Sequence, residues 1–238
     1  MIVFITGGAS GLGEAITRRL ALNPDLKIYF TFCKALEQAK FLEKEFNNTS
    51  SIKCDFRDQQ ELKSLIEKIK EMNIDVLIHN AYAGEFLKTH FQKISPEEFS
   101  KDFLENIMPV IEITQEAIIN MRRNKRGKII TLLTSALHEV PPIGSAVYIA
   151  NKAYVEKLTK VWAHENEKYN ISSISISPSF MLSRLTRNID ERVVEQIREN
   201  NPHKRLLKFE EVAEVVYSLV QRQEYMKTAD IILNPGKT

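Results

Sequence analysis

Three residues in the middle of the chain have the types and spacing of a proton-transfer site. Tyr148 and Lys152 are four residues apart at the start of a helical pattern, so both project from one face of that helix. Ser135 ends an apolar segment 13 residues before Tyr148. A free phenol has a pKa of about 10, and a nearby ammonium lowers it by stabilising the phenolate. Such a tyrosine can donate a proton to a carbonyl oxygen that a serine hydroxyl polarises.

A glycine cluster near the N-terminus has the pattern of a phosphate-binding turn. The chain has eight glycines, and four of them fall in Thr6-Gly7-Gly8-Ala9-Ser10-Gly11-Leu12-Gly13. This segment follows an apolar strand pattern and opens a helical pattern that runs through Leu20. Glycine permits a positive φ and a close approach of the backbone to a ligand, and a helix N-terminus favours a pyrophosphate. We expect dinucleotide binding here rather than a glycine turn without a ligand.

The ends of the next two predicted strands bear on which dinucleotide binds. An acidic residue at the end of the second strand would hydrogen-bond the ribose 2′-hydroxyl of NAD. Lys34 stands there instead and can meet a 2′-phosphate, so we favour NADP over NAD; the alternative is a solvated surface lysine. Asp55, after the third strand, either accepts from the adenine amino group or caps the next helix, although Asp58 suits the cap better.

Strand and helix patterns alternate through the whole chain. Amphipathic stretches, such as the stripe formed by Leu62, Leu65, Ile66 and Ile69, separate the apolar runs. This alternation predicts an α/β fold, a three-layer, doubly wound parallel sheet of Rossmann-like type with about seven strands and helices on both faces. With no repeat or linker, we expect a single domain over 1–238. The predicted strands are Ile2 to Thr6, Lys27 to Phe32, Ser51 to Cys54, Asp75 to His79, Lys128 to Leu133, Ile171 to Ser177 and Ile231 to Leu233.

Composition narrows the class of protein further. Lys and Arg number 33 against 31 Asp and Glu, which excludes a highly charged disordered chain and gives no reason to expect nucleic-acid binding. The longest stretch without these charges, residues 169–183, is too short to span a membrane. The N-terminal MIVFITGG has no basic region, so we expect no signal peptide. Cys33 and Cys54 have no metal-ligand spacing, and two lone cysteines suit a cytoplasmic protein without a metal.

These motifs together resemble the short-chain dehydrogenase/reductase family in its single-domain form, over nearly the whole chain. Within this family, the sequence most resembles the 3-oxoacyl-carrier-protein reductases. The glycine segment matches the family's TGxxxGxG, and Asn80 and Ala81 match part of its NNAG motif. Asn106, Ser135, Tyr148 and Lys152 match its catalytic tetrad. Pro178 begins its PG motif, Ser183 stands at its later threonine, and Asp55 falls at its adenine-contacting aspartate.

The resemblance implies a role for each of these positions. Tyr148 would be the general acid in reduction, and Lys152 would lower its pKa and hold the nicotinamide ribose. Ser135 would orient the carbonyl, and Asn106 would anchor a water in a proton relay. The resemblance also implies that Ser10, Leu12 and Gly13 meet the cofactor phosphates and that Ser183 meets the nicotinamide carboxamide. The other residues expected to bind the cofactor are Gly7, Gly11, Lys34, Asp55, Asn80, Ala81 and Pro178.

Three positions depart from the family pattern. Tyr82 replaces the glycine of NNAG, Ser179 replaces the glycine of PG, and Pro235 interrupts a glycine pair near the C-terminus. Tyr82 either narrows the nicotinamide side of the pocket or folds outward. Ser179 raises the question of whether the loop keeps its geometry. None of the three removes a reacting group.

The expected activity is therefore NADP-dependent interconversion of a carbonyl and an alcohol, with the carrier-protein reductase as a specific alternative. A non-catalytic dinucleotide-binding sensor or scaffold is the second hypothesis, which the intact tetrad disfavours. The resemblance implies a lid at 184–203 and a homodimer or homotetramer. Five basic residues form a cluster: Arg122, Arg123, Lys125, Arg126 and Lys128. This cluster is either a docking surface for an acidic carrier protein or an ordinary solvated helix end.

Overall fold

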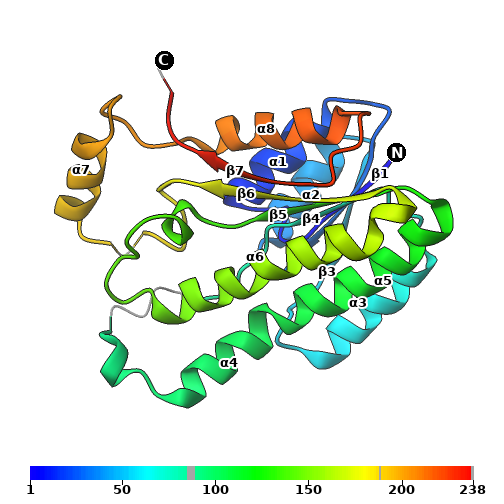
Figure 1. The fold of residues 1–238 in the computed structure, drawn as a ribbon. Coiled ribbons are helices and arrows are strands. Elements are labelled where there is room, and N and C mark those ends of the chain that lie inside the picture. Colours follow the sequence, from blue (N-terminus) through cyan, green and yellow to red (C-terminus); the bar gives the residue numbers. More distant parts are fainter. Residues whose placement is uncertain (85–88, 188, 237–238) are drawn as a thin grey trace.

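Seven parallel strands form one sheet, in the order β3-β2-β1-β4-β5-β6-β7 (Figure 1). The computed structural model describes residues 1–84, 89–187 and 189–236. The predicted doubly wound α/β fold is confirmed, and every predicted strand is present. The strands are β1 (Ile2–Ile5), β2 (Lys27–Phe32), β3 (Thr49–Lys53), β4 (Val76–His79), β5 (Gly127–Leu132), β6 (Ile171–Pro178) and β7 (Thr228–Leu233).

Helices cover both faces of this sheet (Figure 1). One face packs on α1 (Gly11–Ala21), α2 (Leu36–Glu45) and α8 (Phe209–Gln221). The other face packs on α3 (Gln59–Glu71), α5 (Met108–Asn124) and α6 (Ala146–Asn166), with α4 (Pro96–Asn106) beside them. Helix α7 (Glu191–Asn200) stands away from both layers, at the end of the molecule where the strands finish (Figure 1).

The sequence of β1 shows how a strand serves two cores at once. Its residues Ile-Val-Phe-Ile are apolar throughout, as a strand covered on both faces requires. Successive side chains point to opposite faces, so Val3 and Ile5 pack with α1 while Phe4 packs with α3. All three side chains are fully buried. Each face of β1 therefore belongs to a different apolar cluster.

Helix starts are fixed by local hydrogen bonds. Asp58 is the N-cap of α3 and accepts from the backbone amides of Gln60 and Glu61, as its position predicts. Ser95 caps α4 in a reciprocal arrangement with Glu98. The predicted stripe on α3 is largely buried, with Leu62, Leu65 and Ile69 in the core and Ile66 at its margin.

The loops after the strands share one edge of the sheet because all strands run in the same direction. Chain order reverses between β1 and β4, which leaves a crevice at the carboxyl ends of these strands. Short 3-10 turns form at Phe91–Lys93, Ser135–Leu137 and Glu167–Tyr169, and the second of these follows β5 directly. The glycine segment and Ser135 therefore open onto the same edge.

Candidate active site

A cleft of about 1560 Å³ runs along the carboxyl ends of the strands. It brings together nearly all the residues singled out from the sequence. Asn106 is the exception, since it is buried and does not line the cleft. The predicted residues that line it are Gly7, Ser10, Gly11, Leu12, Gly13, Lys34, Asp55, Asn80, Ala81, Ser135, Tyr148, Lys152, Pro178 and Ser183.

The glycine turn is hydrogen-bonded to β2 and is too closely packed to accommodate a side chain at Gly13. The amide of Gly7 donates to Thr31 Oγ1 at 2.9 Å, and Gly7 has a φ of +70°. A Cβ at Gly13 would lie 1.9 Å from the Gly7 carbonyl oxygen. Ser10, the N-cap of α1, makes no side-chain capping bond. A backbone cradle that faces the start of a helix fits the pyrophosphate of a dinucleotide.

Asn80 and Ala81 hold this turn from the end of β4. The Asn80 side-chain amide donates to the carbonyl oxygens of Thr6 at 3.2 Å and Gly7 at 3.0 Å. The Ala81 amide donates to Thr6 Oγ1 at 3.1 Å. Both residues line the cleft, and their visible contacts are with the turn itself. They position the cofactor cradle.

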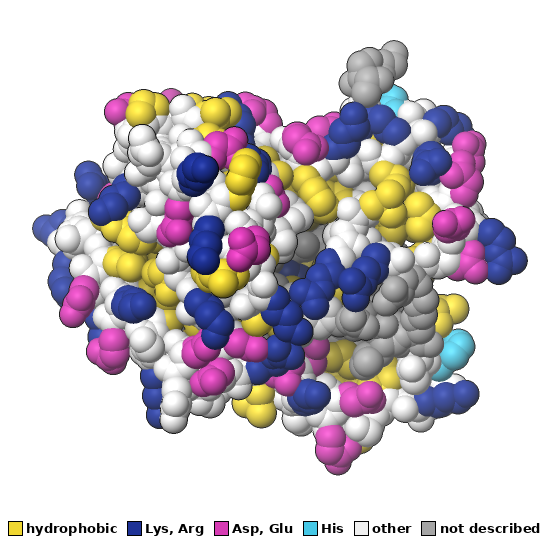
Figure 2. Space-filling view, turned by 180° about the vertical axis from the view of Figure 1, so that it is seen from behind, with side chains coloured by type: hydrophobic (Ala, Val, Ile, Leu, Met, Phe, Trp, Pro, Cys, Tyr) yellow, Lys and Arg dark blue, Asp and Glu magenta, His cyan; other side chains and the backbone are white. Residues whose placement is uncertain are grey.

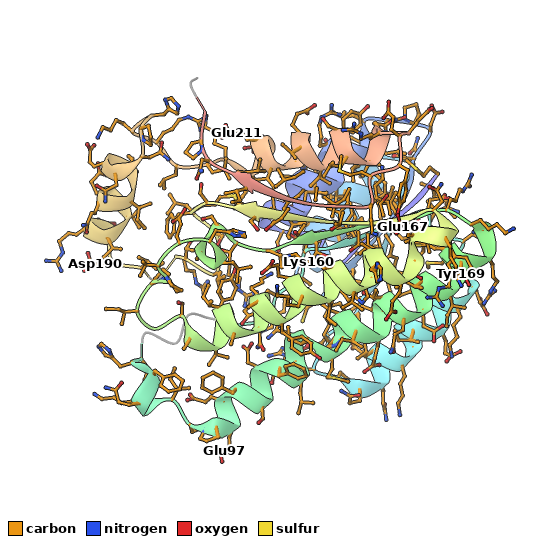
Figure 3. The ribbon with its side chains drawn as sticks, viewed as in Figure 1. Glu97, Lys160, Glu167, Tyr169, Asp190 and Glu211 are labelled. Atoms are coloured by element: carbon orange, nitrogen blue, oxygen red, sulfur yellow. The ribbon has the colours of Figure 1, made fainter. Side chains whose placement is uncertain are left out.

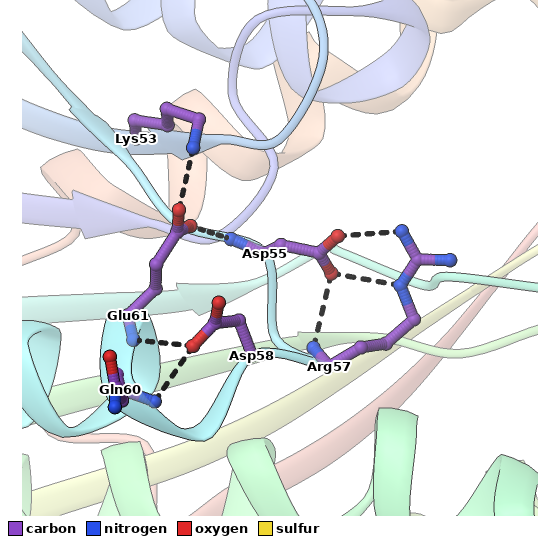
Figure 4. Close-up of polar contacts among 6 residues, drawn as sticks. All are labelled: Lys53, Asp55, Arg57, Asp58, Gln60 and Glu61. Atoms are coloured by element: carbon purple, nitrogen blue, oxygen red, sulfur yellow. Dashed lines mark hydrogen bonds and ion pairs between the residues drawn. The ribbon is translucent and has the colours of Figure 1, made fainter.

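The end of β3 and the start of α3 carry a set of mostly charged side chains (Figure 4). Asp55 pairs with Arg57, whose Nη2 lies 2.6 Å from Asp55 Oδ2 and whose Nε donates to Oδ1 at 2.9 Å. This guanidinium holds the pKa of the Asp55 carboxyl well below its usual range. Asp58 caps α3, so the capping alternative for Asp55 is wrong. Lys34 is exposed at the cleft beside Cys33, and Arg57 also lines the cleft.

Lys152 is fixed between helix α6 and strand β5. Its Nζ donates to the carbonyl oxygen of Leu132 at 2.7 Å. Burial lowers the pKa of Lys152 to about 8, because the charged form loses hydration. The Nζ atom lies 5.8 Å from the ring centroid of Tyr148.

The pKa of Tyr148 is raised, whereas the sequence predicted that Lys152 lowers it. Burial raises the pKa of Tyr148 to about 12, and a hydrogen bond with the Thr134 side chain only partly offsets this. The lowering expected from Lys152 does not offset this effect of burial. The phenol is therefore held in its protonated form, the form that a general acid needs. Thr134, which precedes Ser135, is a site residue that the sequence did not reveal.

Asn106 acts on the loop after β4. Its side-chain oxygen accepts from the Ala83 amide at 2.6 Å, and its side-chain nitrogen donates to Ala83 O at 3.3 Å and Asp102 O at 3.2 Å. These contacts make Asn106 a positioning group for the loop. Its role as the anchor of a relay water stays a prediction.

Two of the three departures from the family pattern have clear structural outcomes. Tyr82 points inward, and its ring packs edge-on against Tyr148 with a centroid separation of 5.0 Å. Ser179 does not adopt a positive φ, so serine fits there without strain, and its amide donates to Leu233 O at 2.8 Å. Pro235 lines the cleft next to Asn234, and the structure gives no further reason for its presence.

The segment after β6 is organised around a buried threonine. Thr186 Oγ1 accepts from the Ser183 amide at 2.8 Å and donates to Met181 O at 2.8 Å. Ile197 and His203, from the predicted lid at 184–203, line the cleft together with Leu185. Residue 188 of this segment lies outside the described residues, and the assignment of 184–203 as a lid stays a prediction.

The basic cluster lies at the wrong end of the molecule for docking beside this cleft. Arg122 stacks 5.0 Å from the Tyr169 ring centroid, and Figure 3 places Tyr169 far from Asp190 at the start of α7. Arg126 pairs with Asp75 at 3.0 Å, and Lys128 Nζ donates to Arg222 O at 2.9 Å. These internal contacts account for much of the cluster. On the rear face, basic and acidic side chains are intermixed (Figure 2).

The described ranges hold neither a membrane-spanning helix nor a metal centre. No helix there is long and apolar enough to cross a membrane. No group of three or more His, Cys, Asp or Glu side chains in the same ranges could hold a metal ion.

Known proteins resemble this chain over almost its full length. The profile of the family described as Enoyl-(Acyl carrier protein) reductase matches residues 7–238. The 3-oxoacyl-[acyl-carrier-protein] reductase of Thermotoga maritima is 28% identical over 97% of this chain and 94% of its own. The corresponding enzyme of Mycobacterium bovis is 27% identical over 98% of this chain and 91% of its own.

Solved structures share the fold. A short-chain dehydrogenase/reductase from Serratia marcescens superposes with a TM-score of 0.85 at 24% identity, covering 98% of this chain and 95% of its own. ElxO with NADP bound superposes with a TM-score of 0.83 at 22% identity, covering 97% and 96%. The family profile matches nearly every residue, and the cleft assembles the matching motifs, so the chain belongs to the short-chain dehydrogenase/reductase family and is an oxidoreductase.

Proposed function

We propose that this protein is an NADP-dependent reductase that converts a carbonyl to an alcohol, with Tyr148 as the general acid. The observation that carries the proposal is the convergence of Ser135, Tyr148 and Lys152 on one cleft with the glycine cradle. When bound there, NADPH supplies a hydride to the carbonyl carbon. The Tyr148 hydroxyl gives its proton to the carbonyl oxygen, and the resulting phenolate is stabilised by the Lys152 ammonium.

The preference for NADP is supported by charge at the ribose end of the cleft. Lys34 and Arg57 both line it, and no carboxylate ends β2. Structures of ElxO and of an actinorhodin polyketide ketoreductase variant hold NADP or NADPH. Two cations suit a 2′-phosphate better than a 2′-hydroxyl.

A 3-oxoacyl thioester is the substrate class that the cleft and the relatives favour. The curated relatives named above are 3-oxoacyl-[acyl-carrier-protein] reductases. Val140 and Leu182 line the cleft although they are 94% and 54% exposed. In Figure 2, hydrophobic side chains also gather on the side where α7 lies. Such an apolar rim fits an acyl chain better than a sugar.

Association into a homodimer or homotetramer belongs to the same proposal. Leu104 on α4 and Val161 on α6 are 58% and 43% exposed, so both helices present apolar surface. Light scattering at micromolar concentration measures the assembly, and a monomer contradicts it.

The test measures NADPH oxidation with a panel of 3-oxoacyl thioesters, keto-sugars and quinones, for wild type and Tyr148→Phe. Loss of the proton donor lowers kcat by about 10²- to 10⁴-fold, while NADPH affinity is retained. Tyr154→Phe is the matched control, since Tyr154 lies on the same helix and packs on Phe103 outside the cleft. Full activity in Tyr148→Phe contradicts the mechanism. Tight NADPH binding without turnover of any carbonyl supports the binding-only alternative.

A further inference from the structure

Tyr82 stands where the family pattern has glycine, and its ring has defined contacts on several sides. The hydroxyl donates to Asp102 Oδ2 at 2.8 Å. The ring meets Tyr148 at an interplanar angle of 87°, with centroids 5.0 Å apart. Lys152 Nζ lies 5.6 Å from the Tyr82 ring centroid. An edge-to-face pair at this separation is a favourable arrangement that restricts both rings.

The Asp102 carboxylate connects Tyr82 to the helix that carries the reacting groups. The same Oδ2 atom accepts from Asn151 Nδ2 at 2.6 Å. Asn151 is 6% exposed and immediately precedes Lys152 on α6. Hydrogen bonds to a carboxylate are stronger than neutral ones. The loop after β4, helix α4 and helix α6 therefore meet at a single oxygen atom.

The space around the ring is closely fitted. A Cβ built on Gly84 would lie 2.6 Å from Tyr82 Cε1. A side chain at position 84 therefore cannot be added without moving the ring. Asn106 holds the intervening Ala83 through both of its backbone polar groups. These contacts in the loop hold the Tyr82 ring in its present position.

We propose that Tyr82 is a positioning residue for proton transfer, whose ring fixes the ring of Tyr148 and shields the Lys152 ammonium from water. Asp102 and Asn151 hold Tyr82 in this position. The inference rests on the proposed function, since it concerns the same pair of reacting groups. It assigns Tyr82 no contact with substrate.

The groups that face Lys152 determine the expected effect on pH dependence. They are Tyr148 on its own helix, Tyr82 on the loop after β4, and His79 on β4, while Asp102 on α4 acts through the Tyr82 hydroxyl. Burial and the charge on Lys152 lower the pKa of His79 to about 3, so His79 stays neutral at working pH. Water admitted beside Lys152 raises its pKa, which lies at about 8 in the intact site.

The first experiment compares Tyr82→Gly, Tyr82→Leu and Tyr82→Phe with wild type. Removing the ring lowers kcat by about tenfold or more, leaves KM for the carbonyl nearly unchanged, and moves the alkaline limb of kcat/KM to higher pH. Tyr82→Phe keeps the ring and restores most of kcat. Wild-type kcat and an unmoved alkaline limb in Tyr82→Leu overturn the proposal.

A double-mutant cycle uses the fit between Tyr82 and Gly84. Gly84→Ala displaces the ring without removing any functional group, so it lowers kcat in the wild-type background. In the Tyr82→Gly background the same substitution has no ring to displace and costs little more. Fully additive losses mean that Gly84 acts independently, and they count against the proposal.

An activity-free measurement separates this inference from the proposed function. The protein is labelled with 3-fluorotyrosine, and the Tyr148 resonance is assigned by its absence in Tyr148→Phe. A fixed ring gives one narrow ¹⁹F resonance in wild type, which broadens or shifts in Tyr82→Leu. An unchanged resonance overturns the positioning role. A changed resonance in a protein that reduces no carbonyl supports the positioning role and contradicts only the proposed function.

Discussion

Under the proposed mechanism, burial of Lys152 defines the pH range in which the site can transfer a proton. Its Nζ donates a hydrogen bond to the Leu132 carbonyl oxygen. This acceptor is uncharged and does not compensate for the hydration that the ammonium loses on burial. The pKa of Lys152 is therefore lowered to about 8, whereas burial raises the pKa of Tyr148 to about 12. On raising the pH, Lys152 loses its proton first, while Tyr148 still keeps its own.

The expected pH profile follows from that order. For carbonyl reduction, kcat/KM stays level below pH 8 and falls as the pH rises through the pKa of Lys152, because the ammonium that stabilises the phenolate is lost. The measurement is kcat/KM between pH 6 and pH 10 at constant ionic strength. A profile that is flat to pH 10 contradicts the assignment.

At the residue scale, the sequence predicted many of the side chains that line the cleft but not what they contact. Ser135, Tyr148 and Lys152 could be named because their place after the fifth strand and their match to the family tetrad add to a spacing that is not specific by itself. From the sequence, the Tyr82 side chain could point into the pocket or away from it. Its inward position depends on Asp102 and Asn151, which come from two other helices. Thr134 and Asn151 gave no signal, because ordinary polar residues beside a motif are common.

At the element scale, the ends of β2 and β3 bring Lys34 and Arg57 to one end of the cleft. In the structure Arg57 pairs with Asp55, and both are partly exposed. An exposed ion pair is weak, so the guanidinium can turn to a phosphate at low cost. Under the proposed function, that turn would leave the Asp55 carboxylate free to accept from adenine.

Substitution of these cations is expected to change coenzyme preference. Lys34→Gln and Arg57→Gln each weaken NADPH binding by roughly five- to tenfold and leave NADH binding nearly unchanged, because only NADPH carries the 2′-phosphate. Fluorescence titration with both coenzymes measures the difference. Lys53→Gln is the matched control, since Lys53 pairs with Glu61 outside the cleft. Equal weakening of both coenzymes by Arg57→Gln shows instead that Arg57 only orients Asp55.

Element types were predictable because the patterns that define them are local. The apolar run of β1 and the capped stripe of α3 both appear in the structure as predicted. The predicted start of β7 at Ile231 was late, because the strand begins at Thr228. Its first residues, Thr-Ala-Asp, lack an apolar pattern and are fixed by pairing with β6 instead. The role of Asp55 could not be decided from the sequence, because an ion pair with Arg57 produces no periodic pattern of residues.

At the scale of the whole molecule, the basic cluster and the cleft lie at opposite ends of the sheet. Lys128 is near the start of β5 and Ser135 follows its end, and a strand of this length spans about 20 Å. A carrier protein that presents its acyl group to the cleft must contact another surface. The hypothesis that this cluster docks the carrier is therefore disfavoured by its position.

Charge reversal tests this separation directly. The double variant Arg123→Glu/Lys125→Glu alters two exposed residues of the cluster and leaves the pair between Arg126 and Asp75 intact. We expect KM for a carrier-linked 3-oxoacyl substrate to stay within about twofold of wild type, because exposed charges beyond a Debye length of ~8 Å are screened. A large rise in KM for the carrier-linked substrate, but not for a short thioester, restores the docking hypothesis.

The position of β1 in the sheet also affects how the chain is made. β1 is paired on one side with β2 and on the other with β4, although about forty residues separate the end of β2 from the start of β4. At a synthesis rate of ~5–20 residues per second, the second edge of β1 waits a few seconds for its partner. Throughout that interval a nascent chain carries an apolar, unpaired strand that ribosome-associated chaperones can bind and that neighbouring nascent chains can join.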